Sequence, residues 1–388
     1  MEVFSRTDMS LFSRWWWTVD RWTIGAVLGL MLAGVILILA GSPAVAEKNN
    51  YDSFHFVKRQ FLFLPFALAT MCVVSFLNER NIRRLAISLL FVSIVLVLFT
   101  LIVGDEVKGA RRWISFFGFK IQPSEFIKPT FIVVSAWLFS MWRLNSNFPG
   151  HIVCSLIYCL VIGLLAMQPD FGMSVLISLV WGLQFFLAGL SITLVMTIGA
   201  LFIFGGFIAY LKFGHVRDRI DQFVDPENNE GFQVERSLEA FYNGGIFGRG
   251  PGEGYIKEKI PDAHSDFIFA VAAEEFGMFA CLIIIALFAF IVLRGFTRVL
   301  KNKDSFSQLA VVGLLSHFGL QAIINLASTV NLDTLMGGLT VVRKGGGNQS
   351  NSLRLQHADG RQFVMRALRK SAERYLQAIA FQNQYVIG

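Results

Sequence analysis

Charged and polar side chains whose types and spacing could support chemistry gather in three segments of this largely apolar chain. The first segment contains Gly-Ala-Arg-Arg-Trp at 109–113 and Gln-Pro-Ser-Glu-Phe-Ile-Lys at 122–128. Adjacent arginines suit a phosphate or pyrophosphate group, because each planar guanidinium donates several hydrogen bonds in a fixed geometry. Lys108, Arg111 and Arg112 are therefore candidate ligands for such a group. The alternative is that this segment only anchors a loop at a membrane interface.

The second half of that segment predicts the start of a helix. Pro123 favours the first helical position, where Ser124 and Glu125 can satisfy free backbone N–H groups. Glu125 and Lys128 are three residues apart and can form an ion pair on one helix face. We take Gln122, Ser124, Glu125 and Lys128 as candidate substrate-binding residues, with a helix cap and its ion pair as the alternative.

The second segment is the tight turn Gln-Pro-Asp-Phe-Gly at 168–172. An ionisable side chain at a membrane boundary is costly and often functional. Asp170 therefore either faces a polar cavity or caps the helix that follows, and the sequence leaves both interpretations open.

The third segment is rich in glycine from Gly244 to Gly254 and continues through Lys257 and Lys259. Its glycines resemble a dinucleotide-binding fingerprint, but no strand precedes them and no βαβ unit surrounds them. The pattern favours a flexible surface turn, in which Arg249 is a further candidate ligand for an anion.

Asp266 lies where this segment returns to apolar sequence, after His264 and Ser265 and ahead of Glu274 and Glu275. We take His264 as a further candidate substrate-binding residue. A carboxyl group at an apolar boundary tends to have a raised pKa, which suits a general base. The alternative interpretation is that Asp266 is the N-cap of a helix.

The composition indicates the elements that must position these residues. The chain is 54% hydrophobic and 16% charged, with a mean hydropathy of +0.57, which excludes an ordinary soluble protein. A bilayer core needs roughly 20 apolar residues per helix. Apolar runs of that kind predict nine spans, at 22–46, 61–77, 85–103, 126–142, 152–167, 171–188, 191–210, 266–296 and 306–330.

Basic clusters near span ends predict a cytoplasmic N-terminus, because arginine and lysine favour the inner side. We therefore expect a cytoplasmic segment at 1–21, a transmembrane domain at 22–330 with one long extracytoplasmic loop at 211–265, and a polar basic tail at 331–388. The net charge of +7 fits membrane topology and anionic lipids better than a nucleic-acid groove.

Together these segments resemble the SEDS family (shape, elongation, division and sporulation) of polytopic cell-wall polymerases. The resemblance rests on GARRW with QPSEFIK, on QPDFG, on the loop ERSLEAFYNGGIFGRGPGEG…KIPDAHSDFIFAVAAEEFG and on QAIINLAST, in the family order. The stretches RWWWTVDRW, SPAVAE and FHFVKRQ are similar to the FtsW branch from alphaproteobacteria. The implied fold is an all-α bundle of transmembrane helices, ten in the family.

The resemblance also implies an activity. It implies a peptidoglycan glycosyltransferase that polymerises lipid II at the septum during cell division, in the bacterial inner membrane. Asp266 matches the essential aspartate of the family and is expected to be the general base. A divalent cation, Mg²⁺ or Mn²⁺, is a possible cofactor, and the expected partners are lipid II, the nascent glycan strand, a class B penicillin-binding protein and other division proteins, with no nucleic acid.

The resemblance ends near residue 330. The family continues with Pro-x-x-Gly-x-x-Leu-Pro-Phe-x-Ser-Tyr-Gly-Gly and a tenth helix, whereas this chain has Asn331-Leu-Asp-Thr-Leu-Met-Gly-Gly-Leu-Thr340 and a basic tail. We expect low polymerase activity unless the tail substitutes for that segment. Two alternatives therefore stand beside the polymerase: a lipid II flippase, and a division scaffold for a class B penicillin-binding protein whose catalysis is lost.

Overall fold

The computed structural model describes residues 11–48, 50–107, 110–116, 119–145, 147–168, 170–190, 230–260 and 263–329. It also describes isolated positions within 193–211 and three strands in the tail. The helices are α1 (Leu11–Thr18), α2 (Arg21–Lys48), α3 (His55–Ser75), α4 (Glu79–Val103), α5 (Pro123–Leu144), α6 (Gly150–Met167), α7 (Phe171–Leu187), α10 (Glu230–Gly244), α11 (Ile268–Val299) and α12 (Ser305–Thr329), with a 3-10 turn η1 (Lys257–Lys259).

Six of these helices are long and apolar enough to cross a membrane: α2, α3, α4, α6, α11 and α12. The chain is therefore a multi-pass membrane protein, and six of the predicted spans coincide with helices of membrane-spanning length. Helices also occupy the predicted spans at 126–142 and 171–188, as α5 and α7. The span predicted at 191–210 lies mostly outside the described residues.

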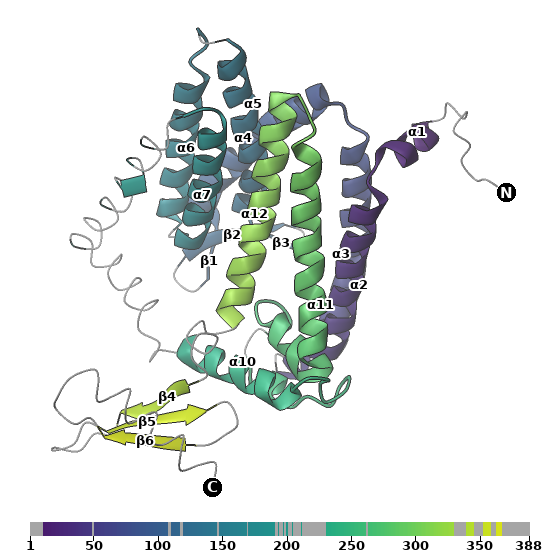
Figure 1. Ribbon diagram of the computed structural model, residues 1–388, viewed down its shortest axis with the longest axis vertical. Coiled ribbons are helices and arrows are strands. Elements are labelled where there is room, and N and C mark those ends of the chain that lie inside the picture. The colour runs from purple at the N-terminus through teal and green to yellow at the C-terminus, as the bar shows by residue number, and fades with distance from the viewer. Residues whose placement is uncertain are drawn as a thin grey trace.

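Helix α12 joins two groups of helices. It packs against α5 and α7 on one side and against α11 on the other. Figure 1 shows α4 to α7 together on one side of α12, and α2, α3 and α11 on the other. The short α10 lies across the end of the bundle at which α11 begins, and the Ser237 hydroxyl on α10 donates to the Thr329 carbonyl at the end of α12 (2.6 Å).

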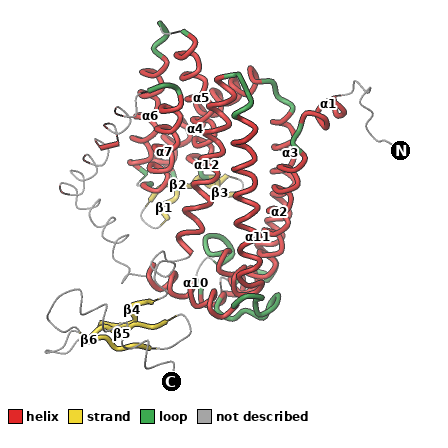
Figure 2. Tube along the Cα trace, in the orientation of Figure 1, coloured by secondary structure: helices red, strands yellow, loops and turns green. Residues whose placement is uncertain are grey.

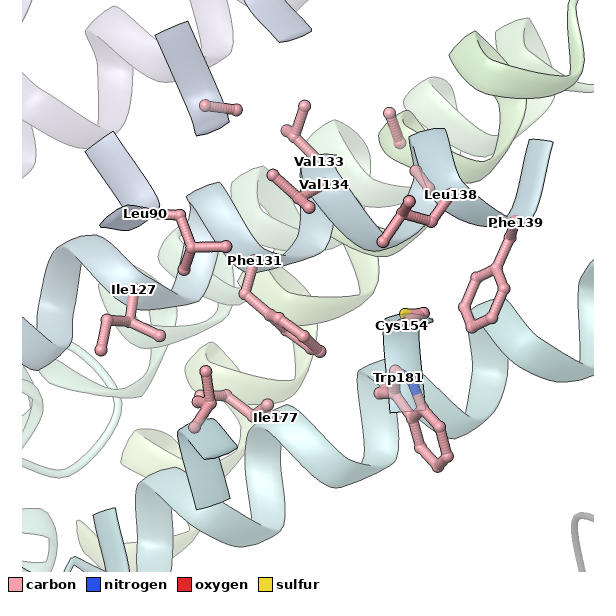
Figure 3. Packing of buried hydrophobic residues seen from close by; sticks show 14 of the residues in the cluster. Leu90, Ile127, Phe131, Val133, Val134, Leu138, Phe139, Cys154, Ile177 and Trp181 are labelled. Carbon is pink, nitrogen blue, oxygen red and sulfur yellow. The ribbon is translucent and has the colours of Figure 1, made fainter. Parts of the chain in front are cut away.

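The larger apolar core surrounds α5. Phe131, Phe139 and Ile127 of α5 are buried and pack against α4, α6 and α7, where Trp181 and Cys154 contribute (Figure 3). Because most of α5 faces other helices rather than lipid, it tolerates polar residues that a lipid-facing helix would exclude.

Two small sheets depart from the all-α expectation (Figure 2). Strands β1 (Asp105–Val107), β2 (Ala110–Phe116) and β3 (Phe119–Ile121) form an antiparallel sheet between α4 and α5. Strands β4 (Leu339–Lys344), β5 (Ser352–His357) and β6 (Gln362–Arg366) form a second antiparallel sheet in the tail. The first sheet lies in the connector between two predicted spans, where the sequence predicted a loop. Its strands of three to seven residues are too short to show a clear alternating pattern of apolar and polar residues.

An ion cluster joins α2 and α11 at the end of the bundle predicted to be cytoplasmic. Arg294 donates two hydrogen bonds to the Asp20 carboxylate, at 2.5 and 2.9 Å, and Arg298 lies 3.2 Å from it. The bond from Arg294 is the main reason why the pKa of Asp20 is held well below its usual range. The cluster therefore fixes the start of α2 against the end of α11.

We predict that Asp20→Asn lowers the melting temperature of the detergent-solubilised protein by several degrees. The change removes the charge that two arginines share in a half-buried site. Asp52→Asn is the matched control, because Asp52 pairs with Lys58 and both side chains are more than half exposed, where ion pairs contribute little. Equal melting temperatures for the two variants would contradict the prediction.

Candidate functional site

Asp266 lies in the turn that leads into α11, and its side chain is exposed. The N-cap of α11 is Phe267, so the interpretation of Asp266 as the N-cap is wrong. Within the described residues, no hydrogen bond or ion pair engages the Asp266 carboxylate. An exposed carboxylate on a fixed turn is accessible to a substrate from outside the bundle.

The residues on either side of Asp266 are firmly packed. Ala263 and Phe267 are buried in an apolar cluster with Val45 of α2 and Val271 of α11. The His264 ring packs against Phe56 of α3, with ring centroids 4.0 Å apart. The turn therefore holds Asp266 in one place while leaving its side chain exposed, and His264 contributes to this packing.

The glycine-rich segment docks against α11 and is not the flexible surface turn that the sequence favoured. Glu274 of α11 is fully buried, and its Oε1 accepts hydrogen bonds from the backbone N–H groups of Tyr255 (3.0 Å) and Ile256 (2.9 Å). Oε2 accepts from the N–H of Lys257 (3.0 Å), and the Asn243 amide donates to Oε1 (2.8 Å). Three successive backbone N–H groups thus enclose one carboxylate, an arrangement suited to an anion.

Glu275, the next residue of α11, is also buried and forms an ion pair with the Lys257 ammonium. The same ammonium donates to the Ala40 carbonyl of α2 (3.1 Å). Lys257 therefore ties the loop to two transmembrane helices at once, and breaking such a buried pair costs about 3–5 kcal/mol.

Helix α11 is interrupted at Gly277, whose φ of 78° and ψ of −179° are not helical. The glycine-rich segment satisfies the backbone groups that this interruption frees. Arg249 and Gly250 donate their N–H groups to the carbonyls of Glu274 and Glu275, both at 3.0 Å. The loop and the broken helix are therefore one hydrogen-bonded unit.

Arg249 takes part in this unit through its side chain as well. Its guanidinium donates to the backbone carbonyl (3.1 Å) and the amide oxygen of Asn243. The side chain is nevertheless exposed, so the remaining guanidinium N–H groups can bind an anion.

The two adjacent arginines on β2 differ in their surroundings. Arg112 donates to the Gln168 carbonyl (3.0 Å) and lies 3.7 Å from the Asp170 carboxylate, so it is engaged within the protein. Arg111 is half exposed beside Glu106 at 3.5 Å and remains the better candidate for a ligand. Lys108 lies outside the described residues.

Of the two roles that the sequence left open for Asp170, the structure confirms the helix cap. It is the N-cap of α7, accepting from the Met173 N–H at 3.4 Å, and it is buried near Arg112. Gln168 adds a further link, because its amide donates to Thr100 of α4 (2.6 Å) and to the Arg111 carbonyl (3.2 Å). These bonds fix the β1–β3 sheet on the ends of α4, α6 and α7.

The start of α5 carries a third polar group. The predicted pair forms, with the Lys128 ammonium 2.7 Å from the Glu125 carboxylate, and Lys128 also donates to Gln321 of α12 (3.4 Å). Ser124 is buried and accepts from the Gln122 amide (3.1 Å); no side chain caps α5, so the capping interpretation is wrong. Because Lys128 is buried while half of Glu125 is exposed, the pair leads from the surface into the bundle.

The predicted residues thus form three groups rather than one. Asp266, His264 and Arg249 belong to the α11 side, and Arg111, Arg112 and Asp170 belong to the α4–α7 side. Glu125 and Lys128 pair at the start of α5, where Lys128 also bonds to Gln321 of α12. The sequence analysis missed Asn243, Lys257 and the buried roles of Glu274 and Glu275. The available signal was two adjacent glutamates within an apolar helical run, which are costly to bury without partners.

A dedicated metal site is not evident in the described part of the chain. No group of three or more histidine, cysteine, aspartate or glutamate residues gathers there. The divalent cation remains a prediction.

These features define a multi-pass helical membrane protein with an exposed carboxylate on a rigid loop at one end of the bundle. The chain belongs to the family of FtsW, RodA and SpoVE, whose model, described as "Cell cycle protein", matches residues 21–341. The match extends past the boundary predicted at residue 330.

Curated relatives agree with this assignment. A protein of Caulobacter vibrioides, named "Probable peptidoglycan glycosyltransferase FtsW", is 40% identical over 331 residues, which is 85% of each chain. A Bacillus subtilis protein with the same name is 30% identical and is matched over 83% of its length by 82% of this chain.

Solved structures show the same fold. One, described as "Structural coordination of polymerization and crosslinking by a peptidoglycan synthase complex", has a TM-score of 0.64 at 24% identity and covers 81% of this chain and 88% of its own. The rod shape determining protein RodA of Thermus thermophilus has a TM-score of 0.56 at 23% identity, covering 80% and 85%.

We predict that Glu274→Ala destabilises the loop strongly and Glu274→Gln only moderately. Alanine leaves three backbone N–H groups without an acceptor, at about 1–3 kcal/mol each. Glutamine keeps the oxygen that accepts from Tyr255 and Ile256 and loses the bond from Lys257. The effect is measured as the rate of limited proteolysis within 244–260 and as the melting temperature. Exposed Glu253→Gln is the control. Equal proteolysis rates and melting temperatures for Glu274→Ala, Glu274→Gln and Glu253→Gln would contradict the prediction.

We predict that Gly277→Ala is damaging although the change is small. A methyl group at this position would lie 2.4 Å from the Gly248 nitrogen and the Ile246 carbonyl oxygen, and φ is positive. Gly182→Ala is the matched control, because nothing lies within 4 Å of its added methyl group on α7 and alanine favours helix by up to about 1 kcal/mol. A melting temperature for Gly277→Ala at or above that of Gly182→Ala would refute the prediction.

Proposed function

We propose that this chain is a peptidoglycan glycosyltransferase that polymerises lipid II during septal wall synthesis, with Asp266 as general base. The observation that carries the proposal is an exposed carboxylate on a rigid turn in a chain 40% identical to a protein named as such an enzyme. Its place at one end of the bundle, away from the Asp20 ion cluster at the other, suits chemistry on one side of a membrane.

The reaction assigns a simple task to Asp266. Its carboxylate takes the proton from an acceptor sugar hydroxyl as that oxygen attacks the anomeric carbon of the donor. The new C–O bond forms as the bond to undecaprenyl pyrophosphate breaks, and inversion converts an α to a β linkage. General base catalysis of this kind contributes about 10²–10⁴-fold in rate.

The leaving pyrophosphate needs positive charge where negative charge develops. Arg111 and Arg249 suit this role because both side chains are exposed. Arg112 is held by Gln168 and Asp170, so we assign it to positioning the β1–β3 sheet. The pair of Glu125 and Lys128 offers a further polar contact at the start of α5.

The partners and location follow from the same assignment. We propose that the chain acts in the bacterial inner membrane at the septum, together with a class B penicillin-binding protein. In support, a solved structure of the same fold is described as a complex that coordinates polymerisation and crosslinking. A flippase needs a polar path through the bundle. The buried polar side chain of Gln184 is instead engaged within the protein, by Ser135 and by the Ile132 and Leu309 carbonyls. The flippase alternative is therefore less well supported.

We predict that Asp266→Asn abolishes polymerisation of purified lipid II in liposomes while leaving the melting temperature unchanged. The exposed side chain contributes little to folding, whereas asparagine cannot accept the proton. Exposed Glu253→Gln on the same loop is the control and keeps activity. The assay contains the penicillin-binding protein partner. If Asp266→Asn still binds this partner, the loss of polymerisation reflects lost catalysis and not a lost scaffold. Glycan strands made by Asp266→Asn would refute the assignment.

A further inference from the structure

The turn at 245–248 is bonded to the part of α11 that follows Gly277. The N–H groups of Met278 and Phe279 begin this part of the helix, and they donate to the carbonyls of Gly245 (2.9 Å) and Ile246 (3.2 Å). Backbone groups at membrane depth must be satisfied by the protein, because lipid offers no partner. The turn therefore lies at the same depth as the helix turn that it caps.

The apolar length of α11 indicates that depth. Sequence from Phe276 to Leu293 carries no charged residue, and at 1.5 Å per residue it spans about 27 Å, close to the roughly 30 Å hydrocarbon core of a bilayer. Arg294, paired with Asp20, marks the inner end of this stretch. Met278 and Phe279 mark the outer end, next to the turn.

The side chains of the turn are apolar and point away from the protein. Phe247 is 84% exposed and Ile246 is 65% exposed. Met278, Phe279 and Leu282 of α11 are each more than half exposed as well. The turn thus extends the apolar outer surface of a membrane-spanning helix, and this continuity identifies lipid as its neighbour.

We propose that the Ile246–Phe247 turn is a membrane anchor, embedded among the acyl chains of the outer leaflet beside α11. Its backbone is held rigidly, since Gly248 has a φ of 79° and an added methyl group there would lie 2.2 Å from the Glu275 carbonyl oxygen. The anchor fixes the loop that carries Arg249 and leads to Asp266 at the membrane surface. This proposal concerns lipid contact and does not depend on the proposed glycosyl transfer.

The test uses a nitroxide label attached to Phe247→Cys in the full-length chain, with Cys72 and Cys159 replaced by serine. The protein is placed in vesicles of phosphatidylethanolamine and phosphatidylglycerol, without a partner protein. Collisions with oxygen, which concentrates in lipid, are compared with collisions with a water-soluble nickel chelate. Leu282→Cys on α11 is the lipid control, and Glu253→Cys on the same loop is the water control.

We expect the label at 247 to match Leu282→Cys, with oxygen accessibility several-fold above nickel accessibility. Accessibility like that of Glu253→Cys would overturn the proposal and assign the turn to a protein partner on the aqueous side. Protection from both reagents would overturn it in favour of burial within the chain. Ile246→Cys provides a second site if Phe247→Cys does not fold, and it is expected to give the same result.

Discussion

The interruption of α11 at Gly277 is the constraint on which the end of the bundle predicted to be extracytoplasmic depends. A broken helix at membrane depth leaves N–H and C=O groups that neither water nor lipid can satisfy. Here the chain between Gly245 and Gly250 satisfies them on both sides of the break. The segment 245–250 is consequently hydrogen-bonded to α11. The two backbones approach so closely that a side chain at position 248 or 277 would collide with the other segment, which explains glycine at both positions.

The buried charges next to the break have a related logic. Burying a carboxylate is costly unless hydrogen bonds or a counter-charge replace its hydration. Glu274 has four such bonds, and Glu275 has Lys257. Asp266, in contrast, is exposed on the turn that follows the same loop. Two carboxylates of α11 therefore fix the position of the loop, whereas the third, that of Asp266, remains exposed.

The sequence predicted much of the fold because apolar runs of membrane length are unambiguous. It also predicted the pairing of Glu125 with Lys128, which depends only on helical spacing. It failed where the outcome depends on tertiary contacts. The glycines of 244–254 favoured a flexible turn. The break in α11, against which they pack, is distant in the sequence and cannot be recognised from the glycines themselves. The sequence could not distinguish Arg112 from Arg111, because Arg112 is engaged by Gln168 and Asp170, which lie near it only in the folded chain.

Helix α12 lies between the two groups of helices that carry the polar side chains. It packs between the α4–α7 group and α11, and its Gln321 accepts from Lys128 of α5. At its end, the Thr329 carbonyl accepts from Ser237 of α10, the helix that continues into the glycine-rich segment. The separation of Glu125 and Lys128 from Asp266 is therefore set largely by one helix. The family match continues to residue 341, past the end of α12 at Thr329, so it includes the whole helix that connects the two groups.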